Sequence, residues 1–135
     1  MTKRAARIAN VRRPLPKVSE EMQQLSEFLR QELLTWPGVT ARPMFGMMAV
    51  YRGNEIFGAL PRTRAMETSR SVSFKLHRQT REIAEALERD SRIVQQEGTM
   101  VSWISMELES ERDIPDALQW FGRAYEQARG RSKAS

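Results

Sequence analysis

The chain has 135 residues, a formal net charge of +5 and no cysteine. Its length suits one compact domain, and the lack of cysteine excludes disulfides, thiolate metal sites and cysteine nucleophiles. No apolar run is long enough to span a membrane, and we expect a cytoplasmic protein without membrane contact.

The positive charge is concentrated at the two ends of the chain. Residues 1–17 carry six Lys or Arg side chains and no acid, and residues 129–135 carry three more basic side chains. Residues 18–128 hold 13 basic and 17 acidic side chains. Because such basic tails bury little apolar surface, we predict that both are disordered and that residues 18–128 form a single domain.

The first predicted helix starts after Ser19. The Ser19 hydroxyl can cap this helix, and the acids Glu20 and Glu21 suit its positive end. Apolar residues then recur every three or four positions and predict one buried stripe, formed by Met22, Leu25, Phe28 or Leu29, and Leu33. The run Trp36-Pro37-Gly38 ends the helix.

A hairpin is predicted next. Residues 44–51 and 56–60 are short and apolar, and the run Arg52-Gly53-Asn54 between them tolerates the backbone of a tight turn. We interpret Gly46 and Gly58 as positions of a bulge or a close backbone approach within these strands. Residues 61–70 are polar and are expected to form a surface loop.

Residues 71–76 give the clearest strand signal, because Val72, Phe74 and Leu76 alternate with polar residues. Thr80 can cap a second helix that runs to about Asp90, with a narrow apolar face. That face consists of Ile83, Ala84 and Leu87.

A turn at residues 97–99 leads into a strand over residues 100–108, and Asp113 can cap a last helix with Pro115 in its first turn. The apolar period of this helix comprises Ile114, Ala117, Leu118, Phe121, Tyr125 and Ala128. The order, roughly α-β-β-β-α-β-α, predicts a two-layer α+β domain with an antiparallel sheet of about five strands and helices packed on it.

The sequence offers little for catalysis. Gly46, Gly53 and Gly58 fit neither a dinucleotide fingerprint nor a P-loop. His77 is the only histidine, and no serine elbow accompanies it. We therefore expect a protein that is not an enzyme, with no catalytic residue, no bound cofactor and no metal site.

A binding function is the remaining possibility, and the sequence offers several candidate surfaces for it. Apolar side chains that would anchor a protein partner or a homodimer, if exposed, are Met47, Met48, Trp103 and Trp120. An alternative is sequence-tolerant contact between nucleic acid and the N-terminal tail, through Lys3, Arg4, Arg7, Arg12, Arg13 and Lys17. A less favoured alternative is a small anionic ligand held by Arg62, Arg64 and Arg70.

Part of this pattern resembles a known family, the N-terminal domain of the TfoX/Sxy competence regulators. The resemblance rests on the order of short motifs over about residues 20–128: Arg42-Pro43-Met44-Phe45-Gly46, Tyr51, Gly53, Phe57, Gly58, Phe74-Lys75 and Trp120. Met47 departs from the family, which commonly has a second glycine there.

The resemblance implies a compact α+β fold akin to YjbR-like and secretion-chaperone domains, without catalytic residues. It implies a small regulatory or interaction domain whose process is unassigned. The family's C-terminal helical domain has no counterpart in the 135 residues, so competence control is not carried over.

Overall fold

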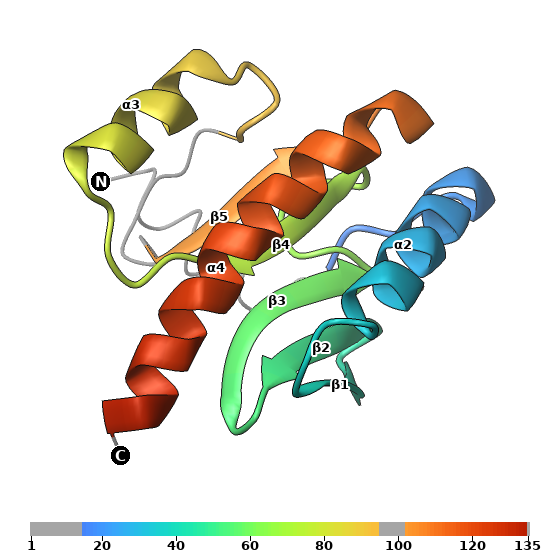
Figure 1. Ribbon diagram of the computed structural model, residues 1–135. Coiled ribbons are helices and arrows are strands. Elements are labelled where there is room, and N and C mark those ends of the chain that lie inside the picture. The colour runs from blue at the N-terminus through green and yellow to red at the C-terminus, as the bar shows by residue number, and fades with distance from the viewer. Residues whose placement is uncertain (1–14, 95–101, 135) are drawn as a thin grey trace, which may run out of the picture.

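The computed structural model describes residues 15–94 and 102–134, which form one five-stranded antiparallel sheet with helices (Figure 1). In chain order the elements are α2 (Glu20–Leu33), β1 (Val39–Met44), β2 (Met47–Arg52), β3 (Glu55–Pro61), β4 (Ser71–Lys75), α3 (Arg81–Arg89), β5 (Trp103–Glu107), the short 3-10 helix η1 (Glu111–Asp113) and α4 (Ile114–Ala134). The α+β class and the sheet of five strands are confirmed. The order contains one strand more than expected between the first two helices.

The strands lie side by side in chain order, and α2 and α4 cover the same face of the sheet (Figure 1). The core lies between these two layers. On β4 the inward side chains are Val72 and Phe74, both fully buried, as the alternation predicts. Phe74 lies 5.6 Å, between ring centroids, from both Trp120 and Phe121 of α4. Aromatic contacts thus join the centre of the sheet to the last helix.

Gly58 of β3 lets α4 approach the sheet closely. A Cβ atom at this position would lie 2.6 Å from Cε1 of Phe121, closer than side-chain carbons normally come. The register between β2 and β3 also shifts beside Gly58, between Val50 and Tyr51. The interpretation of Gly58 as a position of a bulge or a close approach is therefore confirmed, by its contact with Phe121 and by the register shift beside it.

Helix α2 has the N-cap and the buried apolar stripe that the sequence predicts. The Ser19 hydroxyl accepts a hydrogen bond from the Met22 N–H at 3.1 Å, which caps the first turn. Of the two alternatives for the apolar stripe, Leu29 is buried, and Phe28 is 56% exposed. The stripe therefore runs through Leu29 and leaves a phenylalanine on the surface.

The stretch predicted as one strand over residues 44–51 contains a turn. β1 and β2 pair from Val39↔Arg52 to Met44↔Met47, which leaves Phe45 and Gly46 as a two-residue loop. Gly46 has φ +82°, so its placement within a strand was wrong. The apolar run concealed the turn, because only Gly46 is a turn residue and a phenylalanine precedes it. Gly53 lies in the second hairpin turn with φ +60°, as predicted.

Each edge strand of the sheet is protected. Beside β5, the backbone of residues 92–94 adds hydrogen bonds from Val94 N–H to the Ser105 oxygen and from Glu107 N–H to the Arg92 oxygen, each 2.9 Å. On β1, the residues that flank the two-residue turn form a hydrogen-bonded pair, so alternate residues face outward. Pro43 is one of the outward residues and has no N–H to offer another strand.

Several segments of the structure differ in extent from the sequence predictions. Helix α4 continues to Ala134, through Gly130 and into the range expected to be a disordered tail, and no proline interrupts it there. Residues 15–17, assigned to the N-terminal tail, contact the 62–70 loop: the Ala65 N–H donates to the Pro16 oxygen at 2.9 Å. In α3, Ile83 is buried as expected, but Ala84 is exposed, because the helix contacts the core along a narrower face. The predicted turn at 97–99 and residues 100–101 lie outside the described residues.

Candidate functional site: the Phe45 turn

Phe45 combines two properties that are unfavourable for a phenylalanine. Its side chain is 82% exposed, and its backbone has φ +52°, in the left-handed region. A non-glycine residue there lies in a sparsely populated region, which costs stability. A large exposed aromatic side chain also loses the benefit of burial. Folding alone therefore gives no reason for phenylalanine at this position.

The turn is nevertheless held firmly. The carbonyl oxygen of Gly46 accepts hydrogen bonds from the backbone N–H groups of Arg62, Thr63 and Arg64, at 3.0–3.1 Å. A Cβ atom on Gly46 would lie 2.7 Å from Cγ of Arg64, so only glycine fits. The turn and the start of the 62–70 loop thus form one connected structure, which presents Phe45 in a fixed backbone conformation.

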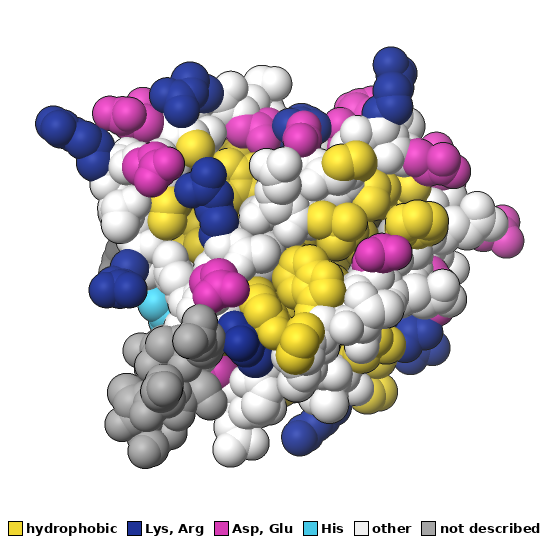
Figure 2. Space-filling model, in the orientation of Figure 1, with side chains coloured by type: hydrophobic (Ala, Val, Ile, Leu, Met, Phe, Trp, Pro, Cys, Tyr) yellow, Lys and Arg dark blue, Asp and Glu magenta, His cyan; other side chains and the backbone are white. Residues whose placement is uncertain are grey.

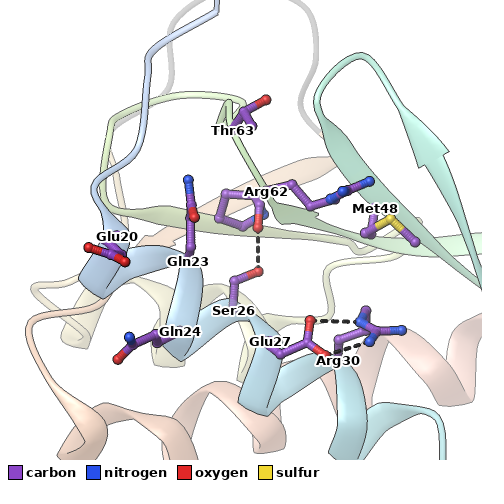
Figure 3. A pocket seen from close by; sticks show the side chains of 10 residues that line it. Glu20, Gln23, Gln24, Ser26, Glu27, Arg30, Met48, Arg62 and Thr63 are labelled. Carbon is purple, nitrogen blue, oxygen red and sulfur yellow. Dashed lines mark hydrogen bonds and ion pairs between the residues drawn. The ribbon is translucent and has the colours of Figure 1, made fainter.

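A hollow of about 350 Å³ lies next to this turn. Its residues are Glu20, Gln23, Gln24, Ser26, Glu27, Arg30, Met48, Pro61, Arg62 and Thr63. Figure 3 shows α2 along one wall, with Arg62, Thr63 and Met48 opposite. The buried Ser26 hydroxyl donates to the Pro61 oxygen at 2.6 Å, which fixes the helix against the end of β3.

Both walls of the hollow carry charge, and its lining holds two acids and two arginines, Arg30 on α2 and Arg62 opposite. On α2, Glu20 and Glu27 face the hollow, and Glu27 binds Arg30 through both carboxylate oxygens. The hydrogen bonds from Arg30 lower the pKa of Glu27, so this carboxylate is ionised at neutral pH.

On the side of the turn, the exposed residues are Lys17, Arg42, Pro43, Phe45, Arg62 and Thr63, which we call the turn patch. It contains three cations and no acid. Figure 2 shows acidic side chains over the region of α2, at the right of the view, in agreement with the acidic character of that helix.

A second polar cluster, which the sequence analysis missed, has a structural role. Arg92 donates to Asp90, Asp113 and Asp116, at 2.8–3.1 Å. Asp90 also accepts the indole N–H of Trp120 at 3.2 Å. The cluster ties residues 90–94, beside β5, to the start of α4.

The charges in this cluster stabilise one another. Burial raises the pKa values of Asp90 and Asp113. Hydrogen bonds, among them those from Arg92, lower these pKa values by more than burial raises them, so both lie below the ordinary range. The three aspartates in turn raise the pKa of Arg92. Asp113 does not act as the simple helix cap expected: its carboxylate accepts hydrogen bonds from Arg92 and from the Glu109 N–H.

The apolar side chains expected to anchor a partner are mostly inside the protein. Met47 is 4% exposed and Trp120 is 7% exposed, so neither offers surface to a partner, contrary to the expectation. Met48 and Trp103 are half-buried. Met48 lines the hollow, and the Lys75 ammonium lies 5.6 Å from the Trp103 ring centroid.

The residues of the family-like motifs divide into two groups. Phe57, Gly58, Phe74 and Trp120 are buried between the sheet and α4. The remaining motif residues belong to the strand ends and turns: Arg42, Met44, Phe45, Gly46, Tyr51, Gly53 and Lys75. Arg42 of β1 lies over the Tyr51 ring, 5.1 Å from its centroid.

The arginines considered for an anionic ligand have other roles. Arg64 donates to the Leu15 oxygen at 2.8 Å, and Arg70 donates to the oxygens of Leu108 and Glu109 at 2.8 Å. Arg62 is exposed and lines the hollow. Of the basic side chains expected to contact nucleic acid, Lys17 is exposed, and Lys3, Arg4, Arg7, Arg12 and Arg13 lie outside the described residues.

Within residues 15–94 and 102–134, no three His, Asp or Glu side chains are placed to hold a metal ion. The helices in that part of the chain are all too short or too polar to cross a membrane. Comparison with known protein families, curated proteins and solved structures finds no match to the chain.

Proposed function

We propose that the chain is a non-enzymatic protein-interaction domain that uses the turn patch to bind its partner. The observation that carries this proposal is Phe45: a phenylalanine 82% exposed, in a left-handed backbone conformation, on a turn fixed by three hydrogen bonds to Gly46. Exposed aromatic side chains on rigid supports are characteristic anchors of protein interfaces, because little entropy is lost when they bind.

Other features support the proposal. The three aspartates that cluster near the start of α4 are bound by Arg92, which favours structure over acid–base chemistry. The edge strand β1 offers no N–H at Pro43, so a partner is expected to bind side chains and not to extend the sheet. The likeness to the TfoX/Sxy motif Arg42-Pro43-Met44-Phe45-Gly46 falls on this same turn and supports a regulatory or interaction role.

Site-specific photo-crosslinking tests this function. Phe45 is replaced by benzoylphenylalanine, which keeps an aromatic side chain at the turn, and the full chain is irradiated in its native cytoplasmic extract. Gln119, exposed on α4, receives the same group as a matched control. We expect a discrete heavier protein adduct from position 45 and none from position 119. Equal adduct patterns from the two positions would show that the turn is ordinary surface.

A further inference from the structure

A strip of apolar surface lies between α2 and α4, on the other flank of α2 from the hollow. It consists of Phe28, Trp36 and Leu118, which we call the α2–α4 strip. Phe28 is 56% exposed, and Trp36 and Leu118 are partly buried against the core. A Cβ atom on Gly122, one helical turn after Leu118, would lie 3.9 Å from Trp36, so this flank of α4 faces the end of α2. Figure 2 shows apolar side chains gathered between the two helices, and contiguous apolar surface of this kind is typical of a binding site.

The charged side chains beside the strip on the two helices are acidic. Glu21 and Glu32 are both exposed and lie seven and four residues from Phe28, on the same flank of α2. On α4, the exposed Glu126 lies one turn after Gly122. The strip therefore favours an occupant that carries both apolar and basic side chains.

The arginines of the same region do not cancel these acids. Arg30 lines the hollow on the other flank of α2, and Arg123 lies over the Trp120 ring on the other flank of α4. Arg52, at the Trp36 end, lies 3.7 Å from the Tyr125 ring centroid and donates to the Tyr125 oxygen at 3.0 Å. Besides Asp113, which Arg92 binds, η1 adds one charge of each sign, Glu111 and Arg112.

Residues 1–14 of the chain itself have the complementary composition. They lie outside the described residues and contain no acid. Their five cations are Lys3, Arg4, Arg7, Arg12 and Arg13, and two bulky aliphatic side chains, Ile8 and Val11, lie among them.

The segment is attached within reach of the strip. Residues 15–17 contact the 62–70 loop, and Leu15 precedes the helix cap Ser19 by four residues, which span at most about 14 Å. Phe28 lies nine residues beyond Ser19, about 14 Å along α2. Leu15 and Phe28 are therefore separated by about 30 Å at most, whereas 14 extended residues reach about 45 Å. Because the segment is tethered, its effective concentration at the strip is high.

We infer that residues 1–14 dock on the α2–α4 strip of their own molecule, in place of the disordered tail that their composition predicts. Ile8 and Val11 cover Phe28, and the cations of the segment face Glu21 and Glu32. The docked segment occludes the strip, so another partner binds there only by displacing it. This surface is separate from the turn patch, so the inference does not rest on the proposed function.

Paramagnetic relaxation in the full chain tests the contact. The chain has no cysteine, so Asn10→Cys accepts a single nitroxide label next to Val11. We expect the label to broaden the amide signals of Phe28 and Leu118 and to leave that of Glu85, on α3, unchanged. Broadening centred on another surface, or confined to the residues that follow the segment in the chain, would overturn the inference.

Substitutions in the strip test which side chains hold the segment. Phe28→Gln should lower the docking equilibrium constant about 10-fold, because it removes the central apolar contact. Glu21→Gln with Glu32→Gln should lower it about threefold at low salt, as expected for two exposed charge pairs. Glu85→Gln with Glu88→Gln makes the same change of charge on α3 and should have no effect. Unchanged broadening in Phe28→Gln, with the thermal unfolding midpoint preserved, would exclude docking on the strip.

A mixed sample separates docking within one molecule from docking between copies. The nitroxide is placed on chains without isotope label, and the amides are observed on ¹⁵N-labelled chains without nitroxide. We expect no broadening of the Phe28 and Leu118 signals in this mixture. Broadening as strong as that within the doubly labelled chain would show that the segment docks on a second copy, and would overturn the intramolecular contact.

Discussion

Gly58 and Phe121 are in such close contact that a single added methyl group would collide with the aromatic ring, 2.6 Å from Cε1. This contact sets the distance between the sheet and α4, and Phe121 is fully buried. The fold that supports the Phe45 turn therefore depends on a glycine that is far from the turn itself.

Gly58→Ala should destabilise the domain by about 1–3 kcal/mol, because the added methyl overpacks the core. Gly122→Ala is a matched control on α4. A Cβ atom there would lie 3.9 Å from Trp36, an ordinary contact, and alanine favours a helix interior by about 0.5–1 kcal/mol. Urea unfolding of both variants should give shifts of opposite sign. Equal shifts would mean that the Gly58 contact is relaxed at little cost.

Arg92→Gln should lower the free energy of unfolding at pH 7 by about 1–2 kcal/mol, after allowance for the partly exposed position of the cluster. The pKa values of Asp90 and Asp113 are depressed in the folded state, so their stabilisation is complete above the pKa values of the unfolded chain. It disappears as the pH falls through the lower, folded pKa values. The difference between wild type and variant should therefore shrink in acid.

Urea titrations between pH 2 and pH 7 measure that difference. Arg89→Gln, a substitution of an exposed arginine nearby on α3, is the control and should shift stability little at any pH. A difference between wild type and Arg92→Gln that stays constant over the whole range would exclude the aspartates as the origin of the stabilisation.

Pro43→Val restores an outward N–H on the free edge of β1 and adds β propensity. We expect a folded protein with new, salt-insensitive self-association, because backbone pairing involves no net charge. Light scattering at low and high salt measures it. Thr40→Val is the control. Thr40 lies on the same strand, but its backbone N–H points toward β2 and not toward the free edge, so this substitution should not produce the effect. An unchanged Pro43→Val protein would show that the edge is protected by other means.

The sequence predicts much of this fold because its signals are local. The Ser19 cap, the Thr80 cap and the alternation around Phe74 each depend on neighbouring residues, and each forms as expected. The choice between Phe28 and Leu29 could not be made from the helical period, because adjacent positions lie at the same edge of the stripe.

The candidate site is harder to predict because its determinants are not local. Phe45-Gly46 lacks the Asn or Asp that usually marks a two-residue turn, so the apolar run appeared continuous. The partners that hold the turn, at residues 62–64, belong to a loop that looked merely polar. Arg92 reaches Asp113 and Asp116 across more than 20 residues, a pairing that no spacing rule indicates.

Phe45→Asn tests the central claim most directly, because stability and binding should change in opposite directions. Asparagine tolerates a left-handed backbone, so the variant should gain about 0.5–1 kcal/mol in free energy of unfolding, measured in dilute solution. With benzoylphenylalanine at the adjacent Thr63 as reporter, the same variant should lose its protein adduct. A Phe45→Asn protein that is no more stable than the wild type, and that crosslinks from position 63 as strongly, would contradict the account.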